Sequence, residues 1–114
     1  MNPNIWSLEK DLSIKTLLVL LQQEFGEGAF IVDTDTPTDF CAIFIHHLQN
    51  PAVRAYLFTV GQQPEYYGVH LEFPLESASA NLLESYENLT LKNLTEMLSV
   101  HLDLVITDDR EWSC

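Results

Sequence analysis

Three aspartates, Asp33, Asp35 and Asp39, follow a short apolar run and carry side chains that could bind a cation or take part in catalysis. Carboxylate oxygens are the preferred ligands of Ca²⁺, and an EF-hand loop places acids at its first, third and fifth positions. Such a loop also needs glycine at position six and glutamate at position twelve, and only the first two positions agree here. The spacing therefore favours a solvated turn.

The same acids belong to a pattern, FIVDTDT at residues 30–36, that resembles the first motif of haloacid-dehalogenase-type phosphotransferases. LVITDD at residues 104–109 resembles their last motif. The resemblance implies Asp33 as nucleophile, Asp35 as general acid or base, and Mg²⁺ as cofactor. That chemistry needs a parallel sheet, whereas the chain between the two patterns predicts antiparallel hairpins. We therefore expect no catalytic site, no cofactor and no enzymatic activity.

Histidines offer a second possible metal site. His70 and Glu72 are two residues apart and would share one face of a strand, which His46 or His47 could approach from a neighbouring strand. The chain has no helical His-x-x-x-His pair, and nothing in the sequence places the two strands side by side. Half-buried strand histidines are the simpler interpretation, so no metal ligand is predicted.

Net charge excludes several classes of partner. Seventeen Asp and Glu outnumber five Lys and Arg, which gives a formal net charge of -12. A field of this sign repels phosphate and anionic lipid and attracts basic protein surfaces. The basic residues are scattered and form no stripe that could follow a phosphate backbone. We expect a basic protein as partner, and neither nucleic acid nor a membrane.

The first residues lack the basic patch and the continuous apolar stretch of a signal peptide, and no run approaches the roughly 18 apolar residues of a membrane span. Two cysteines, Cys41 and Cys114, do not make a disulfide framework. These features predict a cytoplasmic protein.

The apolar spacing changes from helical to strand-like near Gly26. Intervals of three and four predict a helix over Leu8–Phe25, capped by Ser7 or Ser13 and ended by Gly26. Alternation then predicts four strands, of which the third is central: Ala29–Asp33, Phe40–His47, Val53–Val60 and Tyr66–Phe73. Their connections are too short for crossover helices, so the strands form an antiparallel meander.

The pattern after Pro74 is mixed. Ser77–Glu87 predicts a short helix, Thr90 starts a clearer one, and the apolar run Leu102–Ile106 could add a fifth strand. The predicted fold class is α+β, in a single domain over residues 1–114 with residues 1–6 and 108–114 loosely held.

The fourth predicted strand has one apolar face and one that carries polar and aromatic side chains. This face and the acids nearby give the candidate partner contacts: Asp33, Asp35, Asp39, Tyr66, His70, Glu72 and Glu76. In acid-lined inhibitors of nucleases, such carboxylates occupy the positions of substrate phosphates, and aromatic anchors slow release.

The sequences YYGVHLEFP at Tyr66–Pro74, YENLT at Tyr86–Thr90 and LTEML at Leu94–Leu98 resemble small bacterial immunity proteins of contact-dependent and polymorphic toxin systems. The resemblance implies an acidic, cytoplasmic, non-catalytic protein that neutralises a cognate toxin domain, and it transfers no residue role. Two alternatives use the same charge. An effector chaperone of the type III secretion class would order its elements as helix, three strands and helix, and a DNA mimic would space its carboxylates like phosphates.

Overall fold

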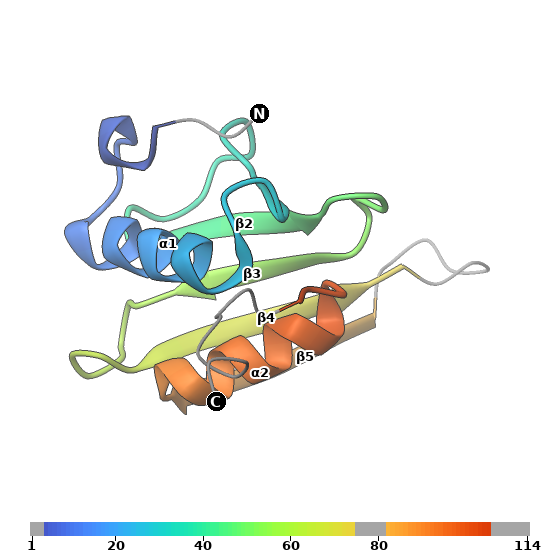
Figure 1. Cartoon of the computed structure of the whole chain (residues 1–114). Coiled ribbons are helices and arrows are strands. Elements are labelled where there is room, and N and C mark those ends of the chain that lie inside the picture. Colours follow the sequence, from blue (N-terminus) through green and yellow to red (C-terminus); the bar gives the residue numbers. More distant parts are fainter. Residues whose placement is uncertain (1–3, 75–81, 106–114) are drawn as a thin grey trace, which may run out of the picture.

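The computed structural model describes residues 4–74 and 82–105, and it has the predicted α+β architecture (Figure 1). Its elements in chain order are η1 (Ile5–Ser7), α1 (Leu12–Phe25), β1 (Phe30–Val32), β2 (Ala42–His47), β3 (Arg54–Phe58), β4 (Tyr67–Phe73), β5 (Leu82–Leu89) and α2 (Leu91–His101). The strands form one antiparallel sheet in the order β1-β2-β3-β4-β5. The predicted meander is confirmed, and β3 is its central strand.

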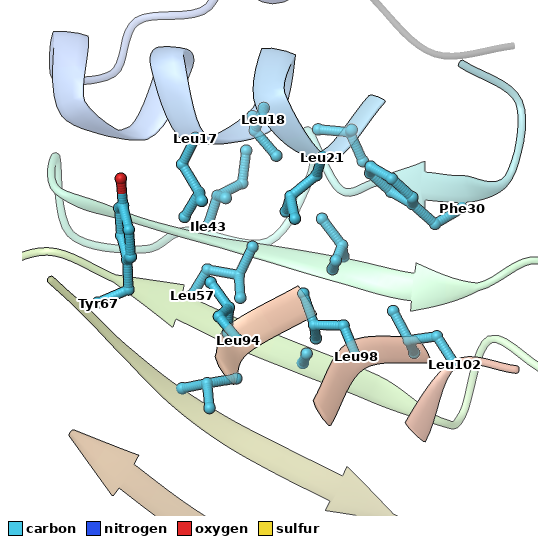
Figure 2. Close-up of a cluster of buried hydrophobic side chains, with 14 of the residues drawn as sticks. Leu17, Leu18, Leu21, Phe30, Ile43, Leu57, Tyr67, Leu94, Leu98 and Leu102 are labelled. Atoms are coloured by element: carbon cyan, nitrogen blue, oxygen red, sulfur yellow. The ribbon is translucent and has the colours of Figure 1, made fainter. Parts of the chain in front are cut away.

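Both helices pack on the same face of the sheet, with α2 beside β4 and β5 (Figure 1). Side chains from both helices meet strand residues in one hydrophobic cluster (Figure 2). Its fully buried members include Leu17, Leu18, Leu21, Ile45, Leu57, Val69, Leu94 and Leu98. Burial of this many aliphatic side chains is the main source of stability, at about 1.5–3 kcal/mol for each. Within residues 4–74 and 82–105, neither helix covers the opposite face of the sheet.

The first helix begins later than predicted because Asp11 caps it. The Asp11 carboxylate accepts a hydrogen bond from the backbone N–H of Ser13, so neither Ser7 nor Ser13 is the cap. Gly26, with a φ of 103°, ends the helix as predicted. Ile5 lies in η1 and is buried in the core, so the loose end predicted for residues 1–6 does not extend to it.

The short helix predicted over Ser77–Glu87 is wrong where the structure describes it, because Leu82–Leu89 forms β5. This strand pairs with β4 in a register that sets Tyr86 opposite Val69. Near its C-terminal end β5 contains a β-bulge, because it has one more residue than β4 between the pairs Val69–Tyr86 and Tyr67–Leu89. Asn88 lies in this bulge and has a φ of 57°. The fifth strand therefore lies before the second helix.

The second helix starts at Thr90 as predicted, since the Thr90 side chain accepts a hydrogen bond from the backbone N–H of Asn93. Neither α1 nor α2, the α-helices of the described chain, combines the length and apolar character required to cross a bilayer.

A helix cap replaces the strand predicted over Leu102–Ile106. Asp103 has a φ of 54°, its N–H donates to the Val100 carbonyl, and the N–H of Leu104 donates to the Ser99 carbonyl. These two bonds define a Schellman cap. Leu104 is buried by this turn rather than by strand pairing, and Ile106 lies outside the described residues.

Candidate interaction site on the open sheet face

The face of the sheet opposite the helices, hereafter the open face, carries most of the ring side chains of the middle strands. Directly paired residues of antiparallel strands point to the same side of a sheet, so the register fixes which residues belong to this face. They are Ile31, Ala42, Phe44, His46, Arg54, Tyr56, Phe58, Gly68, His70, Glu72, Leu83 and Ser85.

Four rings on the open face contact one another across β2, β3 and β4. Tyr56 lies at the centre, with its ring centroid 4.9 Å from that of Phe44 and 5.5 Å from that of His70. Phe58 packs edge-on to His70 at 5.1 Å. These separations are typical of favourable aromatic pairs. The rings thus form one continuous aromatic surface in the middle of the sheet.

Gly68 is required because the ring of Phe58 lies directly over it. A Cβ atom at Gly68 would be 2.1 Å from Cζ of Phe58, well inside van der Waals contact. Phe58 is only 7% exposed, so its ring has little room to move aside. The glycine therefore allows the aromatic surface to lie flat on β4.

Replacing Gly68 by alanine should lower the free energy of unfolding by about 1–3 kcal/mol, because the Phe58 ring must leave its place. Urea unfolding followed by circular dichroism measures this change. Gly28→Ala is the matched control, since a Cβ at Gly28 meets nothing within 4 Å. Equal stability of the two variants would contradict the packing of Phe58 on Gly68.

Arg54 supplies a positive charge on the open face. Its Cζ lies 3.9 Å from the centroid of the Phe44 ring, a cation–π contact. Its Nε also donates a hydrogen bond of 2.9 Å to Oε1 of Glu72. Arg54 therefore stacks on the aromatic surface and neutralises one of the predicted contact carboxylates.

His46 and Asp33 form a second ion pair at the β1 end of this face. His46 Nε2 lies 2.8 Å from Oδ2 of Asp33, and its Nδ1 lies 2.7 Å from the carbonyl oxygen of Pro51. Both partners are acceptors, so both bonds exist together only when the imidazole carries two protons. His46 thus links the loop after β1, through Asp33, to the turn that contains Pro51.

Asp33 also organises the loop that follows β1. Its carboxylate accepts hydrogen bonds from the backbone N–H groups of Asp35 and Thr36 and from the Thr36 hydroxyl. Burial alone would raise the pKa of Asp33, but the bonds from Thr36, His46 and Asp35 outweigh burial and hold the pKa well below its usual value. The Asp33 side chain is only 11% exposed, so its main role is to stabilise this loop.

Asp33→Asn should lower the free energy of unfolding by about 2 kcal/mol near neutral pH, because charge-assisted bonds are lost. Since the folded pKa is lowered, this stabilisation is complete above the unfolded value of 3.8 and is lost as the pH falls below it. Urea titrations at about pH 7 and about pH 3 should therefore show a larger difference at the higher pH. Asp35→Asn, an exposed acid of the same loop, is the control; a pH-independent difference for Asp33→Asn would contradict the assignment.

The structure brings some of the predicted contact residues together and separates others. His70 and Glu72 lie on the open face. Asp33 lies beside the same face, where it contacts His46. Asp35 and Asp39 are exposed on the loop between β1 and β2. Tyr66 is 39% exposed in the turn before β4, and Glu76 lies outside the described residues.

Sequence reasoning missed the residues at the centre of the open face: Phe44, Arg54, Tyr56 and Phe58. The last three alternate along β3 with core residues, but both faces of that strand are apolar, so the alternation did not show which face is open.

Among the predicted contact acids, Asp39 lies close to the centre of the open face. Burial chiefly raises the pKa of Tyr56, and the charge of Asp39 raises it further.

The described residues contain no group of three or more His, Cys, Asp and Glu side chains placed to hold a metal ion. In particular, β3 separates the strand of His46 from the strand of His70. The open face thus combines aromatic rings, one arginine and acids that are paired internally. Comparison of the chain with protein-family models, with curated proteins and with solved structures finds no match.

Proposed function

We propose that this chain is an acidic, non-catalytic inhibitor that binds a basic protein domain through the open face of its sheet. The partner class favoured by the sequence is a nuclease-like toxin domain, which would make the chain a bacterial immunity protein acting in the cytoplasm.

A single observation carries the proposal: a continuous aromatic surface lies on a sheet face that neither described helix covers. Tyr56 and its ring neighbours supply the large, rigid contact area that is enriched at the centres of protein interfaces. The rings of Phe44, Tyr56 and His70 are partly exposed on this face, and a continuous apolar patch at a protein surface is a mark of an interaction site.

In this proposal the negative charge of the chain attracts the partner at long range and makes few direct contacts at the centre of the open face. Asp33 and Glu72 already pair with His46 and Arg54, so they are not free to pair with a partner's cations without giving up those bonds. The net charge of -12 remains, and exposed acids such as Asp35 and Asp39 border the face. Such a field speeds encounter with a basic surface, while buried rings slow release.

The alternatives receive less support. Five strands, rather than three, separate the two helices, which departs from the element order of an effector chaperone. A DNA mimic needs free carboxylates spaced along an extended surface, whereas Glu72 of the open face and Asp33 beside it are held in internal pairs.

Affinity capture from the native host tests the proposal. Tagged protein should recover one basic polypeptide, and the purified pair should form a complex in which the partner's toxic or nuclease activity is blocked at equal stoichiometry. Recovery of no basic polypeptide, or an undiminished activity in the complex, would contradict the proposal.

A further inference from the structure

A cleft of about 470 Å³ lies between α2 and the β4–β5 edge of the sheet, on the face opposite the aromatic surface. Its walls are mainly apolar, with Leu71 and Phe73 from β4 and Met97 and Val100 from α2. Val100 is 83% exposed, an unusual setting for an aliphatic side chain beside a cleft. The volume is within the range of sites that take one large side chain or a small ligand.

The charged side chains described around this cleft have one sign. Glu84 from β5 and Glu96 from α2 both line it and are exposed, and the described lining contains no lysine or arginine. The cleft is therefore matched to a cation with an apolar body. Residues 106–114 of the chain itself carry three acids and one arginine, so their charge does not match.

His101 forms part of the cleft wall and packs edge-on against Phe73. It is 8% exposed, and its buried Nδ1 has no hydrogen-bond partner among residues 4–74 and 82–105. Nε2 lies 2.8 Å from the carbonyl oxygen of Arg54, so Nε2 carries the proton and Nδ1 remains an acceptor. Burial lowers the pKa of His101, which favours this neutral form. His101 therefore contributes a neutral ring to the wall and no positive charge that would oppose a cationic occupant.

The strand beside the cleft has a free edge. In the part of the chain that the structure describes, β5 is the last strand of the sheet and pairs only with β4, and its residues 83–88 are all exposed. Such an edge is a template for an added strand. A segment paired with β5 would place alternate side chains on the helix side, next to Glu84 and Tyr86. Gln62 contacts this strand at Glu87 and Asn88, which leaves residues 83–86 as the open part of the edge.

We infer that the cleft and the free edge of β5 form one peptide-binding site, which takes an extended segment of the partner with an arginine entering the cleft. Arginine fits because its aliphatic stem matches walls such as Met97 and Phe73, while its guanidinium offers donors and a charge to Glu84 and Glu96. Pairing with the strand edge would supply affinity, and the arginine would supply specificity. This inference rests on the proposed function, because it specifies which part of a basic partner is bound.

Fluorescence anisotropy of a labelled eight-residue peptide of alternating arginine and valine, titrated with the full chain at low salt, tests the inference. Wild-type protein should bind this peptide, and a glutamate–valine peptide should not bind. Methylation of alternate backbone nitrogens of the arginine peptide should abolish binding, because it removes the donors that pair with β5.

Two variants with the same charge separate the cleft from the general field of the protein. E84Q/E96Q should weaken binding of the arginine peptide about tenfold, since two exposed ion pairs are lost. E9Q/E65Q removes two exposed acids outside the cleft lining and should change affinity less than twofold. Equal affinities of the two variants, or equal binding of the methylated peptide, would overturn the inference.

The same variants distinguish this inference from the proposed function. If the wild-type chain recovers a basic partner from the host and E84Q/E96Q recovers it equally well, the peptide site is wrong and the inhibitor function stands. If the wild-type chain recovers no basic partner, the inhibitor function is wrong, and the peptide titration alone decides whether the cleft binds a cationic segment.

Discussion

Replacing Tyr56 by alanine should weaken binding of the basic partner about 100-fold, a loss of about 3 kcal/mol. Tyr56 is the central ring of the open face and contacts both Phe44 and His70. Truncation of a central aromatic side chain removes its own contact area and leaves the neighbouring rings without support. Isothermal titration of the purified partner with wild-type and variant protein measures the loss.

Tyr66→Ala is the matched control for this measurement, because it removes the same side chain from the turn before β4. We expect it to change affinity less than fivefold, as is usual away from an interface centre. Urea unfolding of both variants should accompany the titration, so that a loss of fold is not read as a loss of contact. Strong weakening by Tyr66→Ala with none by Tyr56→Ala would place the interface at the turn instead.

Leu98→Ala should lower the free energy of unfolding by about 3–4 kcal/mol. Leu98 is fully buried in α2 and belongs to the cluster that joins both helices to the sheet (Figure 2). Shortening its side chain loses transfer free energy and leaves a cavity. Because the protein is small, this change is a large share of its total stability.

Val100→Ala, two residues away in the same helix, is the control for Leu98→Ala. Val100 is 83% exposed, and alanine is the better helix former, so stability should change by less than about 0.5 kcal/mol. Urea denaturation midpoints of the two variants give the comparison directly. A similar loss in both would mean that α2 is not docked through the face that carries Leu98.

The first helix and the strands of the meander follow from the sequence because each has one face in the core. Leu17, Leu18 and Leu21 recur at helical intervals, and Val69 and Leu71 alternate along β4. Gly26 and Thr90 mark helix ends through local chemistry that needs no tertiary contact. Each of these features is decided by residues close in sequence.

The edge strand β5 could not be predicted in this way. Its residues 83–88 are exposed on both sides, so no alternation of apolar and polar side chains develops. Leu82, Leu83 and Tyr86 instead give a helix-like spacing. Pairing with β4, which depends on residues distant in sequence, decides the strand conformation.

The aromatic residues at the centre of the open face could not be predicted from the sequence for a related reason. Along β3, Ala55 and Leu57 face the core while Tyr56 and Phe58 face outward, and both sets are apolar. Sequence therefore identifies a central strand without revealing which side the helices cover. By contrast, the polar positions of β4, His70 and Glu72, do locate the same face.

Hydroxyl-radical footprinting of the chain alone and in complex with its basic partner tests the central claim most directly. Binding through the open face predicts that oxidation of Phe44, Tyr56 and His70 falls when the partner is present, while oxidation of Trp6, 55% exposed in η1, stays the same. Unchanged oxidation of the three rings in a saturated complex would contradict the claim that the open face binds the partner.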